Sequence, residues 1–108
     1  MTVSIKSRRI ITPDGIKDGY VNLSDGKILS VTEEKIPAEA EHDSGDEYLS
    51  PGFIDIHTHG GAGHDFSGTL EDVSRAADFH LTHGTTSICP TVSAAPLEVM
   101  AKALDSIS

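Results

Sequence analysis

Residues 50–63 have the sequence SPGFIDIHTHGGAG and carry the strongest indication of the fold. Residues 53–56 are an apolar run typical of a buried parallel strand, and the glycine-rich loop 60–63 follows closely. Side chains on a strand alternate between its two faces. We therefore expect one face to carry Asp55, His57 and His59, and the opposite face to carry Ile54, Ile56 and Thr58.

Helix and strand patterns alternate downstream of this stretch. Thr69 suits a helix N-cap, with acidic residues in the first turn after it, and Gly84 stands where a C-terminal cap belongs. Residues 85–89 predict the next strand, and Pro96 suits the first turn of another helix. This strand–helix–strand–helix order predicts parallel strands joined by right-handed crossovers.

The first fifty residues predict β-structure. Residues 3–11 are rich in β-branched side chains. Asp25-Gly26 separates the strand-like segments 20–24 and 27–31, which is a strong signal for a hairpin with a type I′ turn. The acidic segment 32–47 predicts an exposed connection with at most a short strand.

Composition excludes several classes of protein. The chain has 108 residues, the size of one small domain, and its 37% hydrophobic content is not that of a disordered chain. A net charge of −9 disfavours nucleic-acid binding, which depends on Lys and Arg. There is no apolar run long enough for a membrane span and no signal-peptide pattern at the start. The single cysteine, Cys89, excludes an intrachain disulfide and is expected to be buried and inert. We therefore expect a soluble, cytoplasmic protein without a nucleic-acid or membrane partner.

The candidate metal ligands are His57 and His59. Two imidazoles on one face, at the C-terminal end of a strand, can bind one metal ion, and imidazole suits zinc as well as iron or nickel. Paired histidines at a strand end are also found as ordinary surface residues. Asp55 is either a residue that orients a ligand or a polar contact inside a barrel, and the sequence leaves both open.

The loop after the strand supplies further candidates. Gly60 and Gly61 let the backbone approach a ligand closely. His64 and Asp65 either face a substrate or are ordinary loop residues. The histidines of the first helix, His80 and His83, are expected to be structural or solvated.

The string SPGFIDIHTHGGAGHDF, residues 50–66, resembles the first barrel strand of the amidohydrolase superfamily. The glycine loop and the string HGTTSICPT, residues 83–91, resemble the N-acetylglucosamine-6-phosphate deacetylases in particular, and residues 12–31 resemble the β-sandwich domain that precedes their barrel. The resemblance implies an α/β fold. Residues 1–50 would form part of a small β-sandwich, and residues 51–108 the first two βα units of an incomplete TIM-type (β/α)8 barrel.

The same resemblance implies a function. His57 and His59 would bind a divalent metal, zinc or else iron or another ion, which activates water against the acetamide of an amino-sugar phosphate. The family's glutamate ligand, two further histidine ligands and catalytic aspartate have no counterpart before Ser108. We therefore expect no catalytic residue in this chain, an inactive isolated chain, and a longer, homodimeric parent enzyme.

Two other interpretations stay open. Cyclic amidases of the dihydroorotase or hydantoinase kind are also amidohydrolases, but they often carry an arginine soon after the His-x-His strand, whereas here the next is Arg75. A short, non-enzymatic binding module is the other alternative. It is disfavoured because unpaired strand edges invite aggregation.

Overall fold

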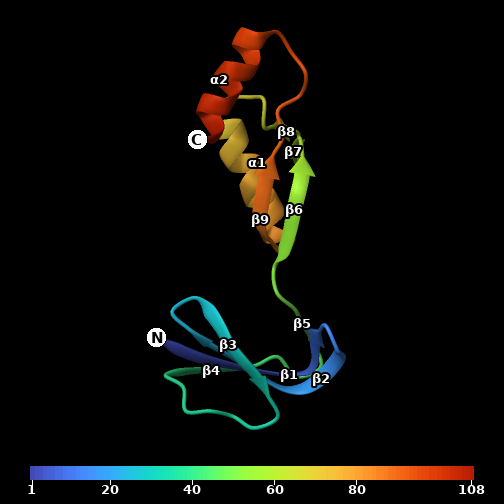
Figure 1. Ribbon diagram of the computed structural model, residues 1–108, viewed down its shortest axis with the longest axis vertical. Helices are drawn as coiled ribbons and strands as arrows, with labels where there is room; N and C mark the ends of the chain where they lie inside the picture. Colours follow the sequence, from blue (N-terminus) through green and yellow to red (C-terminus); the bar gives the residue numbers. More distant parts are fainter. The chain divides into compact units, whose positions relative to one another are not determined.

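The computed structural model describes all 108 residues and divides them into two compact units, Met1–Pro51 and Gly52–Ser108. The first unit is built of strands, and the second combines strands with two helices (Figure 1). None of the helices is long and apolar enough to cross a membrane. The chain is thus a mixed α/β protein with a strand-rich N-terminal portion.

The first unit contains a single five-stranded sheet. Its strands are β1 (Thr2–Thr12), β2 (Gly15–Ser24), β3 (Lys27–Thr32), β4 (Ala40–Asp43) and β5 (Tyr48–Leu49). Strands β1, β2 and β3 run antiparallel in sequence, while β4 and β5 each pair in parallel with β1. The predicted hairpin is confirmed: Asp25 and Gly26 have φ of 50° and 77°, the positive values that a type I′ turn requires. The second layer of a β-sandwich stays a prediction.

One face of this sheet is polar. Asn22, which is fully buried, accepts a hydrogen bond from Ser4 Oγ at 2.8 Å and donates to the hydroxyls of Ser30 and Thr32 at 3.1 and 2.9 Å. Every polar group of this buried amide is therefore satisfied within the sheet. The opposite face is apolar: Val21 is buried, while its register partner Val31 is 40% exposed.

The second unit has the predicted alternation. Its elements are β6 (Phe53–Thr58), β7 (Gly60–Gly61), β8 (His64–Asp65), α1 (Leu70–Thr82), β9 (Thr85–Pro90) and α2 (Leu97–Ile107). Strands β6 and β9 pair in parallel and lie side by side in Figure 1, which confirms the parallel arrangement. Helix α1 packs against β9 and against the short hairpin β7–β8. Closure into a barrel stays a prediction.

The helix ends follow the sequence signals closely. Thr69 is the N-cap of α1 and forms a capping box with Asp72, each side chain accepting from the other residue's backbone N–H. Gly84 follows the last turn with φ of 90°, as expected of a C-terminal cap. Pro96 lies one position earlier than predicted, at the N-cap of α2, because its ψ of 145° is extended rather than helical.

Burial differs from the prediction on β6 and β9. Phe53, Ile54 and Ile56 are 63%, 73% and 78% exposed, although the apolar run predicted a buried strand. Cys89, expected to be buried, is exposed as well. The physical reason is that these two strands pair only with each other, so no further strand lies beside them, and α1 packs against β9 on one side only. The buried apolar residues of this unit are Phe66, Ala76 and Ala103.

Candidate metal and substrate site

The side chains of β6 alternate between two faces as predicted. The rings of His57 and His59 lie next to each other, with centroids 5.1 Å apart and planes at 83°. Between them, Thr58 points the other way, and its Oγ1 lies 3.4 Å from Nε2 of His80 on α1. The two candidate ligands therefore share the face of β6 that α1 does not cover.

The ring of His59 is held by the end of β9. Its Nδ1 lies 2.9 Å from the backbone carbonyl oxygen of Thr91 and 3.2 Å from the hydroxyl of Ser93. A carbonyl oxygen only accepts, so Nδ1 is the protonated nitrogen and Nε2 keeps its lone pair in the neutral ring. Metal-binding histidines are commonly oriented in this way, with the second nitrogen donating to a carbonyl or a carboxylate.

Asp55 has a different contact from the one that would orient a ligand ring. Its Oδ1 accepts a hydrogen bond from the backbone N–H of His57 at 3.1 Å. It thus fixes the backbone that carries His57, and no hydrogen bond joins it to the imidazole. Its role in orienting a ligand stays a prediction.

The donor set fits part of a metal site. Both imidazoles are exposed and adjacent, and one has a free Nε2. Nevertheless, no group of three or more His, Cys, Asp or Glu side chains in the chain lies close enough together to hold a metal ion. Catalytic zinc sites use three protein ligands and a water. His57 and His59 therefore suit two of the ligands and need at least one more.

The glycine loop is a tight hairpin. Gly60 pairs with Asp65 and Gly61 with His64 across β7 and β8. A Cβ at Gly60 would collide with the backbone carbonyl of His64, and one at Gly61 would come within 2.7 Å of the Phe79 ring. These glycines are needed for packing within the unit, so close approach to a ligand is not their only explanation.

His64 is fixed by Asp72 at the start of α1. Its Nδ1 lies 2.9 Å from Asp72 Oδ1, while Asp72 Oδ2 accepts from the backbone N–H and the hydroxyl of Thr69 at 2.9 and 2.7 Å. The hydrogen bond from His64, followed by those from Thr69, holds the pKa of Asp72 well below its ordinary value. The carboxylate is therefore ionised at neutral pH.

The sequence did not reveal this pairing. The spacing of Thr69 and Asp72 indicates a capping box, but the contact with His64 depends on the hairpin that folds back to α1. Asp65, the neighbouring candidate, accepts from the backbone N–H of Ser67 at 2.6 Å and so shapes the turn into the helix.

The helix histidines are structural, as expected. Nε2 of His80 lies 3.0 Å from the carbonyl oxygen of Gly60, and its ring stacks on the fully buried Phe66. His83 Nδ1 lies 2.8 Å from the carbonyl oxygen of Phe79, one turn earlier in α1.

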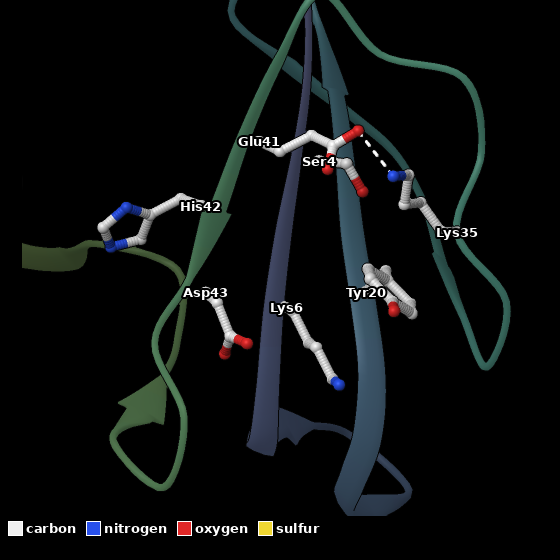
Figure 2. Close-up of a pocket in the computed structure, with 7 residues that line it drawn as sticks. All are labelled: Ser4, Lys6, Tyr20, Lys35, Glu41, His42 and Asp43. Carbon is white, nitrogen blue, oxygen red and sulfur yellow. Dashed lines mark ion pairs between the residues drawn. The ribbon is translucent and has the colours of Figure 1, made fainter.

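The first unit has a separate hollow on the polar face of its sheet (Figure 2). It has a volume of about 340 Å³ and is lined by Ser4, Lys6, Tyr20, Lys35, Glu41, His42 and Asp43. Lys35 pairs with Glu41 at 2.6 Å, and the His42 ring points away from Lys6 and Tyr20. The lining holds two lysines and two carboxylates, so it presents no net charge that would select a ligand.

Comparison with known proteins connects the chain to amide hydrolases. Residues 4–44 match the family model described as the allantoinase composite domain. The chain is 46% identical over 79 residues to the N-acetylglucosamine-6-phosphate deacetylase of Bos taurus, covering 69% of this chain and 19% of that protein. It is 36% identical over 111 residues to an N-acetylgalactosamine-6-phosphate deacetylase of Escherichia coli O157:H7, covering 100% of this chain and 28% of that protein.

A relative that aligns over a shorter stretch and a solved structure are also similar to the chain. A D-hydantoinase of Ralstonia pickettii is 41% identical over 59 residues, covering 55% of this chain and 13% of that protein. The structure of the Mycobacterium smegmatis N-acetyl-D-glucosamine-6-phosphate deacetylase, with N-acetyl-D-glucosamine-6-phosphate bound, superposes with a TM-score of 0.85 and 25% identity. It matches 98% of this chain and 28% of the other, so the chain spans between a fifth and somewhat over a quarter of the deacetylases it resembles.

Proposed function

Because this chain is homologous to part of the N-acetylglucosamine-6-phosphate deacetylases of the amidohydrolase superfamily, we propose that the protein is a deacetylase of N-acetylglucosamine 6-phosphate. The products are glucosamine 6-phosphate and acetate, a step of amino-sugar catabolism. The observation that carries the proposal is the paired imidazoles of His57 and His59 at the C-terminal end of β6. Barrel enzymes build their active sites at this end of their strands.

We propose that His57 and His59 are two ligands of a divalent metal ion, with zinc the first candidate and iron or another divalent ion next. Such an ion, when bound, lowers the pKa of water and polarises the amide carbonyl. The chain's own residues prepare the position. The Thr91 carbonyl orients the His59 ring so that Nε2 is available, and Asp55 holds the backbone at His57.

In this proposal the remaining metal ligands and the catalytic base belong to a part of the enzyme that these 108 residues do not include. The 108-residue chain alone is therefore inactive. Residues 51–108 are the first two βα units of a TIM-type barrel, and residues 1–50 belong to a β-sandwich. The exposed Ile54 and Ile56 support this, because such apolar side chains on a parallel strand call for a covering layer. The assembled enzyme is a cytoplasmic homodimer.

The alternatives are two other substrates and a non-enzymatic role. The N-acetylgalactosamine-6-phosphate relative aligns with the whole chain, which makes the epimeric amino sugar the second candidate. A cyclic amide is the third, on the similarity to a hydantoinase. The exposed apolar side chains of β6 are what favours a non-enzymatic binding module, because a partner protein could cover them.

The test is acetate release by the protein expressed from its complete coding sequence. We expect acetate from N-acetylglucosamine 6-phosphate faster than from N-acetylgalactosamine 6-phosphate, abolition by a metal chelator, and recovery on adding zinc. His57→Ala combined with His59→Ala is compared with His42→Ala, a histidine of the first unit that lies outside the site. Undiminished acetate release by the double variant would contradict the metal assignment, and hydrolysis of a hydantoin alone would contradict the substrate.

A further inference from the structure

The contact between His64 and Asp72 joins two elements that the proposed function does not connect. His64 lies on β8 of the hairpin that follows β6, and Asp72 lies in the first turn of α1. We propose that Asp72 is a positioning residue that holds the His64 imidazole with Nδ1 protonated. His64 Nε2 then accepts a hydrogen bond from a hydroxyl group of an amino sugar.

The carboxylate of Asp72 divides its contacts between two tasks. Oδ2 takes both hydrogen bonds from Thr69 and completes the helix cap, while Oδ1 accepts from His64 Nδ1 at 2.9 Å. A capping residue needs only the first set. The contact with His64 is therefore additional to the cap, and a carboxylate on one imidazole nitrogen fixes which nitrogen carries the proton.

The ring of His64 is held rigidly but is not enclosed. His64 pairs with Gly61 across the hairpin, and the backbone N–H of Phe66 donates to the carbonyl oxygen of His59 at 2.8 Å, which closes the loop. The side chain is 31% exposed, and its hydrogen bond within the chain is the one through Nδ1. Nε2 therefore has no hydrogen-bond partner within the chain, on a side chain that is partly open to solvent.

The charges around His64 select the kind of ligand. Asp65 follows His64 on β8 and Asp72 accepts its hydrogen bond, so both of these neighbours are carboxylates, whereas Glu71 pairs with Arg75 at 2.8 Å. A phosphate group would be repelled there, whereas a neutral hydroxyl can donate to an imidazole lone pair without an electrostatic cost. This choice of ligand rests on the proposed function, since that function makes an amino sugar the substrate.

The first measurement concerns the ring alone. Long-range ¹H–¹⁵N spectra of the full chain at about pH 8, where an ordinary imidazole is neutral, report which nitrogen of His64 carries the proton. We expect the Nδ1-protonated form in the wild type and a mixture of forms in Asp72→Glu, which keeps a capping-box residue but moves the carboxylate. Thr69→Ala is the matched control: it weakens the cap, and the protonation of His64 should not change. An Nε2-protonated ring in the wild type, or a form unaffected by Asp72→Glu and Asp72→Asn, would overturn the positioning role.

The second measurement concerns the ligand. N-acetylglucosamine and inorganic phosphate are titrated separately against the full chain. We expect the His64 Nε2 signal to shift with the sugar and not with phosphate, and His64→Ala to weaken sugar binding about tenfold, the loss of roughly one hydrogen bond. A shift with phosphate alone, or with neither compound, overturns the assignment to a hydroxyl. Sugar binding without acetate release by the complete enzyme would instead refute the proposed function and leave this inference standing.

Discussion

Replacing Phe66 by alanine tests whether a local hydrophobic core holds the β7–β8 hairpin, which carries His64 and Asp65. Phe66 is fully buried, stacks on His80, and connects the hairpin to α1. Removing a buried phenylalanine side chain costs about 3–5 kcal/mol, because transfer and cavity terms add. Since a domain is stable by only about 5–15 kcal/mol, we expect the free energy of unfolding of the second unit to fall by about a fifth or more.

Phe53→Ala is the matched control in the same unit. Phe53 is 63% exposed, so about a third of its side chain is covered and the expected loss is about 1–2 kcal/mol. Urea unfolding followed by far-UV circular dichroism measures both variants, and Phe66→Leu provides a milder change should Phe66→Ala not fold. Equal losses for Phe66→Ala and Phe53→Ala would refute the assignment of Phe66 as the centre of this small core.

Three further predictions concern charge, exposure and the helix cap. The pKa of Asp72 in the folded chain lies below its ordinary value of 3.8, so the ionised carboxylate contributes stability that is lost as the pH falls below that value. Asp72→Asn should therefore flatten the acid side of a plot of unfolding free energy against pH. An unchanged plot would contradict the contribution of Asp72. Cys89 is exposed and should react with a thiol reagent without denaturant, whereas protection until unfolding would show that it is buried. Thr69→Ala should cost about 1 kcal/mol in urea unfolding, and no loss would contradict the cap.

The parts of the fold that depend on neighbouring residues were predictable. The Asp25-Gly26 turn, the Thr69 cap and the Gly84 terminus each follow from the conformation of one or two residues. The parallel pairing of β6 and β9 followed from the order of strand and helix patterns. The turn and the helix ends thus follow from short-range signals, whereas the strand pairing follows from the order of the elements along the chain.

The parts that depend on distant residues were not predictable. The pairing of β4 with β1 joins segments about forty residues apart, and the contact of His64 with Asp72 depends on how a hairpin meets a helix. The prediction that β6 is buried was also wrong. A hydrophobic pattern shows which side chains prefer the interior, but not whether neighbours are present to cover them. Phe66, which follows β8, is enclosed, whereas Phe53, the first residue of β6, is not.

A zinc titration of the ¹⁵N-histidine-labelled chain tests whether His57 and His59 bind a metal ion together. We expect the ring signals of His57 and His59 to change together, with His59 responding at Nε2 while Nδ1 keeps its contact with Thr91, and those of His42 and His83 to stay unchanged. A uniform response of all six histidines, or a response that excludes His57 and His59, would contradict it.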